Sequence, residues 1–463
     1  MRRISCIPDV PNPHSGSIRA RIASSMPLVR KMFLIAAHQG DCSQKNRKMT
    51  APTNYTTSIP PLDTSAAAGT QPIVAKPLPA VLKQVHCLDD FQPLARNKLP
   101  RQLYSYIANG ADDEVSMGRN RQAFNRWAFS PRVLEGVEKR TQGITLFDQQ
   151  YASPFGISPV GLAAMWCYRG DIVLAKTARE HRVPAVMSGA SLIRMEDIAE
   201  AAPGTWFQAY LPGDEKRIAE LLARIEAAGF GTLVLTVDLP VQVNPERYVK
   251  NGFSTPLRPS ARLAWDGISH PRWLAGTFLR TLARHGMPHF ENWRAERGAP
   301  ILSASVKRDF VARDHLCWEH VKVARKLWRG PLVIKGIMRK EDALLARSAG
   351  ADGIIVSNHG GRQLDSSLSP LDVLPEIAEA ADGLVVMMDS GMRRGTDVLK
   401  ALALGARCVF NGRSFNYAAT VAGEAGVAHA IHILRTEVDR DMALLGINHP
   451  YEIDHTLLRR MPL

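Results

Sequence analysis

The sequence predicts an α/β fold in which eight parallel strands close into a (β/α)8 barrel, also called a TIM barrel. Two observations support this prediction. Eight short apolar runs rich in β-branched residues recur between residues 155 and 410, and amphipathic stretches with a helical period separate most of them. Eight strands with intervening helices are the number that such a barrel contains. A doubly wound open sheet would show the same alternation and is the structural alternative.

The expected elements follow one another in chain order. A short amphipathic helix comes first, because Leu103, Tyr106, Ile107 and Ala111 fall on one helical face. The candidate strands are 155–158, 185–187, 206–209, 233–237, 332–334, 354–356, 384–388 and 408–410. The candidate helices between them include 171–180, 215–228, 340–349 and 395–404.

Residues 1–85 are expected to form a disordered N-terminal extension ahead of a barrel domain over residues 86–463. Ser, Thr, Pro, Ala and Gly dominate residues 50–79, and no apolar period persists there, so this stretch has little apolar surface to bury. The sequence after Met49 looks like an ordinary protein start, which gives the hypothesis that residues 1–48 derive from a misassigned start codon. Mass spectrometry of the native protein would test it.

The composition limits the classes of partner. The 463-residue chain has a formal net charge of +14. The first fifty residues carry nine Lys/Arg and two Asp, so nine minus two, or seven, of these charges lie there. The remainder is only mildly basic and predicts no nucleic-acid partner.

The six cysteines are scattered, with no CxxC or Cys/His cluster, which predicts neither a metal site nor a disulfide framework and is typical of a reducing cytoplasm. No apolar run reaches transmembrane length.

One connection is much longer than barrel loops usually are. About ninety residues, 239–331, separate the fourth and fifth candidate strands and form an insertion. Within it, residues 256–290 interleave Trp, Phe and Leu with five arginines, against the single acid Asp266. This mixture suits the surface of an anionic bilayer and predicts peripheral membrane contact. A lid packed on the barrel mouth is the alternative that the sequence leaves open.

The most informative stretch follows the sixth candidate strand and reads SNHGGRQLD at residues 357–365. A histidine can take a proton near neutral pH, and an arginine three residues later can hold a carboxylate through two parallel hydrogen bonds. The glycines let the backbone approach a flat ligand. We therefore expect His359 to act as a base and Arg362 to bind a small acid beside a cofactor, at the rim where barrels of this kind carry their chemistry.

This run resembles the active-site motif of the FMN-dependent α-hydroxy-acid dehydrogenases and oxidases, the family of L-lactate dehydrogenase, mandelate dehydrogenase and glycolate oxidase. The resemblance extends from about Leu99 to the C-terminus, and several separate motifs recur in the family's order. It implies a (β/α)8 barrel, bound FMN, and the oxidation of a 2-hydroxy acid. It also implies a homo-oligomer, usually a tetramer, and attachment to membranes through the inserted loop in the mandelate and lactate dehydrogenases.

The resemblance implies catalytic and substrate-binding roles at several strand ends. Tyr106, in the motif LPRQLYSY, matches the tyrosine that hydrogen-bonds the substrate carboxylate. Tyr210 would donate a hydrogen bond to a substrate oxygen. Asp238 would fix the tautomer of His359 and stabilise the imidazolium formed on proton abstraction. Lys335 would stabilise negative charge on the reduced flavin.

The resemblance places the FMN contacts on the turns that follow the strands. Gly161 ends the turn SPVG after the first strand, and a glycine there, where oxidases often have alanine, favours a dehydrogenase. Arg393 and Arg413 follow strands seven and eight and would neutralise the FMN phosphate. The expected FMN contacts are Pro159, Val160, Gly161, Ser188, Gln208, Thr236, Lys335, Ser357, Asp389, Gly391, Arg393, Gly412 and Arg413.

Two positions depart from the family pattern. After Asp238 the family usually shows Gly-x-Arg, whose arginine assists substrate binding, whereas Pro245 stands at that place here and Arg247 is the candidate replacement. Ala190 stands where oxidases often carry a large aromatic residue, which leaves room for a different or bulkier substrate.

We therefore expect FMN-dependent oxidation of a lactate- or mandelate-like (S)-2-hydroxy acid to the 2-oxo acid, with electrons passed to a quinone or another acceptor. The alternatives are an oxidase that produces hydrogen peroxide, a flavin-binding barrel without turnover, and a phosphate-sugar isomerase on the same fold. The expected location is the cytoplasm, at the inner face of the cytoplasmic membrane if residues 256–290 touch a bilayer.

Overall fold

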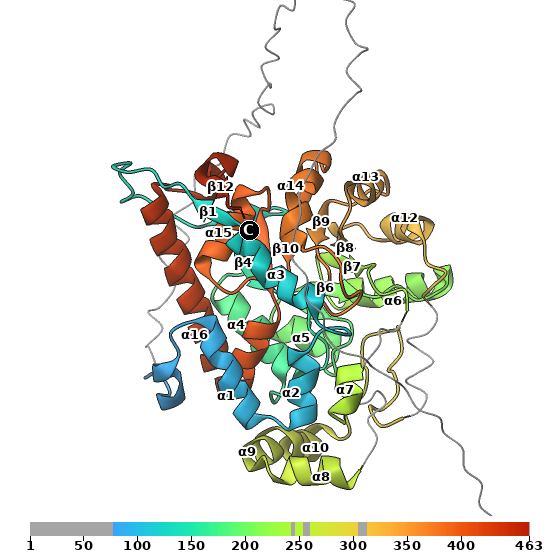
Figure 1. Ribbon diagram of the computed structural model, residues 1–463. Helices are drawn as coiled ribbons and strands as arrows, with labels where there is room; N and C mark the ends of the chain where they lie inside the picture. Colours follow the sequence, from blue (N-terminus) through green and yellow to red (C-terminus); the bar gives the residue numbers. More distant parts are fainter. Residues whose placement is uncertain (1–76, 242–245, 253–259, 304–312, 463) are drawn as a thin grey trace, which may run out of the picture. The chain divides into compact units, whose positions relative to one another are not determined.

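The computed structural model describes residues 77–241, 246–252, 260–303 and 313–462 (Figure 1). Within this part of the chain, eight parallel strands form one sheet in the order β4-β11-β10-β9-β8-β7-β6-β5. An isolated parallel bridge between Ile157 and Ala185 joins the two ends of the sheet, so the strands close into a barrel. The predicted (β/α)8 barrel is confirmed, and the doubly wound open sheet is excluded.

Every candidate strand is present, and the bounds differ from the predicted ones by a few residues at most. The barrel strands are β4 (Phe155–Ile157), β5 (Val186–Ser188), β6 (Trp206–Ala209), β7 (Leu233–Thr236), β8 (Leu332–Ile337), β9 (Gly353–Val356), β10 (Val385–Asp389) and β11 (Cys408–Asn411). Parallel strands buried on both faces read as continuous apolar runs, which is why the sequence located them so well.

The helices that follow the strands cover the outside of the barrel (Figure 1). They are η4 (Ala163–Met165), α4 (Gly170–Glu180), α5 (Met195–Ala201), α6 (Glu215–Ala227), α12 (Trp318–Leu327), α13 (Lys340–Ser348), α14 (Pro370–Ala380), α15 (Gly395–Ala403) and α16 (Arg413–Leu445). The four predicted helices correspond to α4, α6, α13 and α15. Non-helical dihedral angles at Ala422 and Gly423 divide α16 into two helical segments, and Gly423 supplies the positive φ of 58° that this bend requires.

The inner face of the barrel is apolar at the N-terminal ends of the strands. Val186, Trp206, Val234, Val333, Ile355, Met387, Cys408 and Phe410 form one buried cluster with residues of the β-hairpin β2 (Ile144–Leu146) and β3 (Gln149–Tyr151). Trp206 donates its indole N–H to the Tyr151 hydroxyl over 3.0 Å. A Cβ at Gly353, the first residue of β9, would lie 2.8 Å from the Phe147 ring. The hairpin therefore closes this end, so any site lies at the other end.

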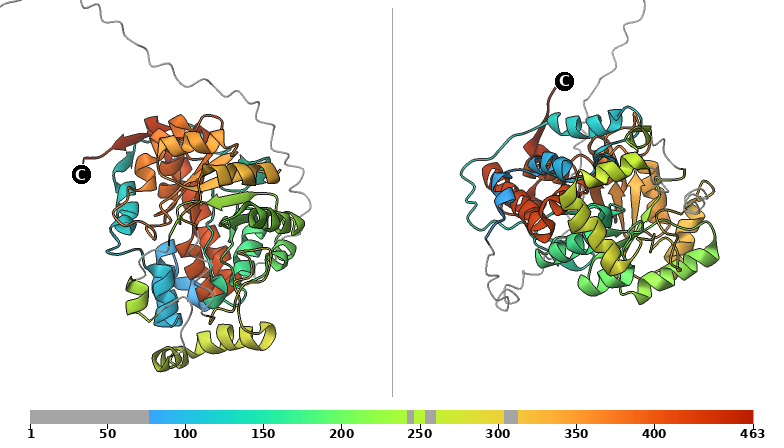
Figure 2. Two further views of the ribbon diagram at one scale, coloured as in Figure 1. Left: turned by 90° about the vertical axis from the view of Figure 1, so that its right-hand side faces the viewer. Right: turned by 90° about the horizontal axis from the view of Figure 1, so that it is seen from below.

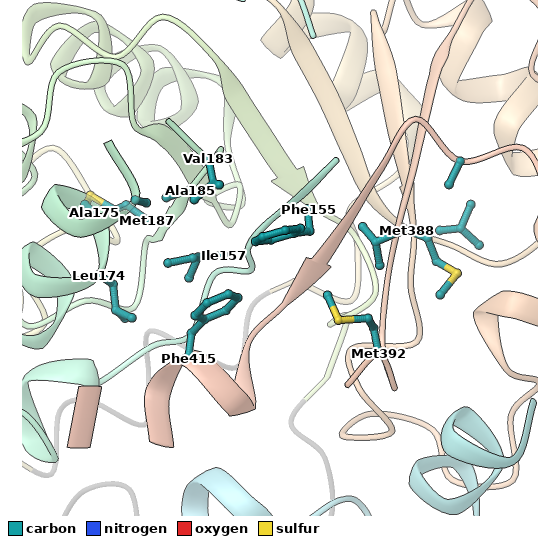
Figure 3. Close-up of a cluster of buried hydrophobic side chains, with 14 of the residues drawn as sticks. Phe155, Ile157, Leu174, Ala175, Val183, Ala185, Met187, Met388, Met392 and Phe415 are labelled. Atoms are coloured by element: carbon teal, nitrogen blue, oxygen red, sulfur yellow. The ribbon is translucent and has the colours of Figure 1, made fainter. Parts of the chain in front are cut away.

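The outer face of the strands packs against the helices in a second, larger core. Figure 3 shows one part of it, where Phe155 and Ile157 of β4 lie among Leu174, Val183, Met187 and Phe415. The two cores share strands but face opposite sides, as the alternation of side chains along a β-strand requires.

Shorter elements precede and follow the barrel. They are η2 (Ala80–Gln84), η3 (Leu88–Asp90), α1 (Phe91–Lys98), α2 (Arg101–Ala108), α3 (Val115–Asn125), β1 (Trp127–Phe129), η6 (Pro450–Glu452), η7 (His455–Leu457) and β12 (Leu458–Arg460). Strand β1 pairs antiparallel with β12. The predicted first helix is α2. The last nine residues of the predicted extension, 77–85, are described and contain η2, whose Leu82 is buried in the core; residues 1–76 lie outside the described part.

The insertion between β7 and β8 carries α7 (Glu246–Lys250), α8 (Ala261–Ile268), α9 (Pro271–Trp273), the π-helical turn η5 (Leu274–Leu279) and α10 (Arg280–His285). Figures 1 and 2 show α8 to α10 at the end of the molecule that carries α1 and α2, away from α13 and α14. The Asp266 carboxylate of α8 accepts a hydrogen bond from the backbone N–H of Arg101 over 2.7 Å. None of the helices in the described residues is long and apolar enough to cross a membrane.

Candidate active site

A ring of buried polar side chains lies at the C-terminal ends of the barrel strands. On six strands, a polar residue follows an inward-pointing apolar residue by two positions, so both point to the same side. These polar residues, all buried, are Ser188, Gln208, Thr236, Lys335, Ser357 and Asp389. Buried polar groups cost stability unless they are paired or functional, and this rim is where (β/α)8 barrels carry their active sites.

His359 and Asp238 meet across the barrel mouth. Nδ1 of His359 lies 2.9 Å from Oδ1 of Asp238. Burial raises the pKa of the Asp238 carboxyl, but the charges of His359 and Lys335 and the hydrogen bond from the imidazole lower it more, so the pKa lies below its usual value. An ionised carboxylate only accepts hydrogen bonds, so Nδ1 carries a hydrogen, and in the neutral imidazole the lone pair is then on Nε2. The predicted pairing of His359 with Asp238 is therefore present.

The turn that carries His359 has an unusual backbone. His359, Gly360 and Gly361 all have positive φ angles, of 57°, 70° and 73°. A histidine in this conformation is uncommon, and such residues cluster at functional sites. A Cβ at Gly361 would lie 2.6 Å from the backbone nitrogen of Met117, and one at Gly360 would lie 2.8 Å from Nη1 of Arg413. The glycines are thus required both by the dihedral angles and by close neighbours.

Lys335 lies at the centre of a buried charged network. Its ammonium group donates to the Ser357 hydroxyl over 2.8 Å and lies 3.2 Å from Oδ2 of Asp389. Ser158 and Ser390 each donate to the Asp389 carboxylate over 2.9 Å. Burial raises the pKa of Asp389, but the Lys335 charge and the hydrogen bonds of Ser357 and Ser390 lower it more, so this carboxyl stays ionised. The sequence pointed to Lys335 and Asp389 separately and did not show that each is the other's counter-charge.

Two hydrogen-bond donors on the inner face have no partner in the described residues. Ser188 and the backbone N–H of Gly189 both donate to Oε1 of Gln208, over 3.1 and 3.3 Å. This leaves the Nε2 group of Gln208 buried without an acceptor, and the hydroxyl of Thr236 is likewise buried without a partner. Leaving such a group unsatisfied costs about 1–3 kcal/mol. A flat ligand with carbonyl oxygens and ring nitrogens, lying on the barrel mouth, would satisfy both.

The guanidinium groups of Arg362 and Arg413 contact the C-terminal end of helix α2. Arg362 donates to the carbonyl oxygens of Tyr106 and Asn109 over 2.8 and 3.0 Å, and its guanidinium lies 5.0 Å from the centroid of the Tyr106 ring. Arg413 donates to the carbonyl oxygens of Ile107 and Gly360 over 3.1 and 2.9 Å. Cations are favourable at the C-terminal end of a helix, which explains why both arginines gather there.

Tyr210 lies in the same cluster. Burial raises the pKa of its hydroxyl, the charge of Asp238 adds to the rise, and two guanidinium groups, those of Arg313 and Arg362, oppose it. The Arg313 guanidinium lies 4.5 Å from the centroid of the Tyr210 ring. Arg313 is the first described residue after the gap at 304–312, and no sequence pattern drew attention to it.

The turns predicted to contact a cofactor lie around the same rim. A Cβ at Gly161 would lie 2.8 Å from the Ala190 methyl, and a Cβ at Gly412 would lie 2.8 Å from Cγ2 of Val160. Each glycine thus allows close packing of neighbouring turns. Pro159 lies in the turn between Ser158 and Val160.

Two of the expected FMN contacts after strand β10, Gly391 and Arg393, have further contacts within the described residues. Gly391 has a φ of 89° and packs on the Asn120 backbone, where a Cβ would lie 2.4 Å from the carbonyl oxygen. Arg393 forms an ion pair with Asp89, with Nε and Oδ1 3.2 Å apart. The Asp89 carboxylate therefore neutralises part of the positive charge of Arg393.

The candidate replacement for the family's arginine lies in another network. Arg247 pairs with Glu114, with Nη1 and Oε2 3.3 Å apart, and donates to the carbonyl oxygen of Asp112 over 3.0 Å. Pro245 lies outside the described residues. The contacts of Arg247 connect α7 to the segment between α2 and α3 and give no support to the substitute role.

Comparisons with known proteins agree with this site. The FMN-dependent dehydrogenase family matches residues 95–460. The chain belongs to this family. It is 37% identical over 363 residues to (S)-mandelate dehydrogenase of Pseudomonas putida, covering 78% of this chain and 90% of the relative. It is 39% identical over 387 residues to L-lactate dehydrogenase of Caulobacter vibrioides, covering 81% of this chain and 97% of the relative.

The structural comparison gives the same result. The crystal structure of the monotopic membrane protein (S)-mandelate dehydrogenase superposes with a TM-score of 0.75 and 34% identity, covering 82% of this chain and all of that one. This FMN-dependent enzyme is thus an oxidoreductase, as the sequence predicted. The rim residues fit the cofactor, because the unpartnered donors of Gln208 and Thr236 match the hydrogen-bond acceptors of an isoalloxazine ring.

Proposed function

We propose that the protein oxidises an (S)-2-hydroxy acid, of the lactate or mandelate kind, to the corresponding 2-oxo acid. The observation that carries the proposal is the 2.9 Å contact between His359 and Asp238, at the mouth that also holds Lys335 and Arg362. Bound FMN would supply the two-electron acceptor and would gain negative charge at the N1/O2 edge of its ring.

His359 is assigned as the base. Its Nε2 lone pair takes a proton from the substrate and becomes positively charged, and the Asp238 carboxylate, close to Nδ1, stabilises that imidazolium. If the electrons leave as a hydride from the α-carbon, the proton comes from the hydroxyl group. If they leave through a carbanion, the proton comes from the α-carbon, and the hydroxyl proton is released as the 2-oxo group forms. In both cases Asp238 acts by fixing the tautomer and by its charge.

Arg362, Tyr106 and Tyr210 are assigned to the substrate. A guanidinium binds a carboxylate through two parallel N–H donors, and the phenol hydroxyls can donate to the remaining oxygens. Fixing the acid in this way holds its α-carbon in one orientation toward the cofactor. Lys335 would interact with the negative charge that the cofactor gains, and Asp389 keeps this lysine charged and in place.

We infer that the insertion also contacts a membrane. Trp265, Ile268 and Leu279 are 72%, 60% and 50% exposed. The neighbouring arginines 272, 280 and 284 are exposed as well. Exposed apolar and cationic side chains on consecutive helices of the insertion suit an anionic bilayer. The opposite face packs on the barrel, since Trp273 is buried and its indole donates to the Met165 carbonyl oxygen over 2.7 Å.

This inference favours a quinone as electron acceptor and the inner face of the cytoplasmic membrane as location. The mandelate dehydrogenase of known structure is a monotopic membrane protein, which supports the same arrangement for this chain. Flotation with vesicles of phosphatidylcholine, with and without phosphatidylglycerol, tests it. We expect the protein to float with the anionic vesicles, and recovery in the soluble fraction with both would contradict membrane contact. A homotetramer remains a prediction from the resemblance.

Anaerobic titration of the FMN-loaded protein with lactate, glycolate and mandelate tests the activity. We expect at least one of these acids to bleach the flavin absorbance. Slow recovery in air and fast recovery with a quinone are expected of a dehydrogenase, whereas fast recovery in air would identify a hydrogen-peroxide-producing oxidase. A flavin spectrum that no 2-hydroxy acid changes would point to the flavin-binding barrel without turnover.

A further inference from the structure

The insertion between β7 and β8 places one buried arginine, Arg313, at the barrel mouth. Arg313 is 7% exposed, so its guanidinium lies almost entirely out of contact with water. Its guanidinium lies 4.5 Å from the centre of the Tyr210 ring. Tyr210 follows β6 and points to the same side as Gln208, two positions earlier, on the inner face of the barrel. Arg313 is therefore held against a residue of the active site by a segment that belongs to none of the eight strand–helix units.

In the candidate site, a guanidinium group lies against each of two tyrosine rings. Arg362 lies 5.0 Å from the Tyr106 ring centroid, and Arg313 lies 4.5 Å from that of Tyr210. Burial raises the pKa of the Tyr210 hydroxyl, the charges of Asp238 and Tyr106 add to the rise, and both guanidinium groups oppose it, so Arg313 and Arg362 act on the same tyrosine. A planar guanidinium next to an aromatic ring keeps N–H donors at its edge, and the same cation attracts an anion nearby.

We propose that Arg313 is a second anion-binding arginine of the active site, which acts on the substrate carboxylate from the side of Tyr210 while Arg362 acts from the side of Tyr106. This inference rests on the proposed function, because it assumes that a 2-hydroxy acid is the ligand. A carboxylate has two oxygens with about four acceptor positions, so it can interact with both sides at once.

Two physical consequences follow from this assignment. The carboxylate brings a negative charge close to a buried guanidinium, where opposite charges attract each other more strongly than in water. The Arg313 guanidinium also restricts the Tyr210 ring, so that the phenol hydroxyl is oriented before the substrate arrives. The role is one of binding and positioning, and the proton transfer stays with His359.

The test compares a charged ligand with its neutral isostere. Pyruvate and phenylglyoxylate, and the amide of each, are titrated into the oxidised, FMN-loaded enzyme by calorimetry. Arg313→Met removes the charge and the guanidinium plane at similar length, whereas Arg313→Lys keeps the charge. Arg297→Met is the matched control, because Arg297 lies in the same insertion and pairs with Glu291, with Nη2 and Oε1 2.9 Å apart.

We expect Arg313→Met to raise the dissociation constant of the carboxylates about 10- to 100-fold, which corresponds to about 1.4–2.8 kcal/mol. The amides should lose less than about threefold, because the lost interaction acts mainly on the negative charge. Arg313→Lys should recover part of the affinity, and Arg297→Met should match the wild type. In turnover, Arg313→Met should raise KM far more than it lowers kcat.

Three outcomes distinguish the inference about Arg313 from the proposed function on which it rests. Equal losses for carboxylates and amides would show that Arg313 has only a structural role. If Arg313→Met binds the carboxylates as tightly as the wild type does, and a 2-hydroxy acid reduces the wild type, the inference about Arg313 is overturned. The proposed function then still stands. A wild type that neither binds a 2-oxo acid nor is reduced by any 2-hydroxy acid would remove both. If Arg313→Met does not fold, the same comparison of carboxylate with amide is made on Arg313→Lys and Arg313→Gln.

Discussion

Replacing Asp238 with asparagine tests the pairing on which the proposed chemistry depends. The carboxylate oxygen lies 2.9 Å from Nδ1 of His359, and both side chains are mostly buried. At an effective dielectric constant near 20, unit charges about 4 Å apart attract each other by about 4 kcal/mol. This attraction is lost when the base becomes positively charged beside a neutral amide. Since about 1.36 kcal/mol corresponds to a tenfold change in rate, flavin reduction in Asp238→Asn should be about a thousandfold slower.

Stopped-flow absorbance under anaerobic conditions measures this rate directly. Asp238→Glu serves as the matched variant, because it keeps the carboxylate on a side chain one methylene longer and should recover part of the lost rate. Both variants should bind FMN and should keep the wild-type circular dichroism spectrum. A reduction rate in Asp238→Asn within tenfold of the wild type would show that the contact is structural and would refute the assignment of roles.

Four further outcomes follow from the geometry. Gly161→Ala places a methyl 2.8 Å from the Ala190 methyl and should lower stability by about 1–3 kcal/mol in urea unfolding, with recovery in the double variant that also carries Ala190→Gly. Thr236→Val removes a buried hydroxyl without a partner, so it should leave the apoprotein at least as stable while weakening FMN binding by fluorescence titration. The Asp389 carboxyl has a lowered pKa because its lysine partner outweighs burial. Its stabilising contribution is therefore present above the unfolded pKa of about 3.9 and is lost as the pH falls through the folded value; urea unfolding from neutral to acid pH should show less of this loss in Asp389→Asn. Trp265→Ser should weaken flotation with anionic vesicles and leave flavin reduction unchanged, because this side chain is 72% exposed.

Most of the barrel could be predicted because its signal is local. Each strand is an apolar run ended by a turn, and parallel strands buried on both faces leave that pattern in the sequence. Helix α16 and its bend at Ala422 and Gly423 were not among the predicted elements. The hairpin that closes the barrel was missed because three-residue strands are too short to show a period.

The site was predicted to the extent that its residues lie at strand ends. Gln208, Thr236 and Lys335 follow from the alternation of side chains, and His359 follows from the glycine-rich motif. The pairing of Lys335 with Asp389 could not be predicted, because it joins positions 54 residues apart whose distance only the closed barrel determines. No sequence pattern identified Arg313, because a single arginine in a long basic insertion does not differ from the other arginines around it.

The most direct measurement of the central claim is anaerobic flavin reduction by a 2-hydroxy acid that carries deuterium at its α-carbon, in the wild type and in His359→Asn. The account predicts a slower rate with the deuterated acid in the wild type, because the bond from the α-carbon breaks beside His359. It also predicts that His359→Asn still binds the 2-oxo acid but is not reduced. Reduction of His359→Asn at the wild-type rate would contradict the claim that this imidazole is the base.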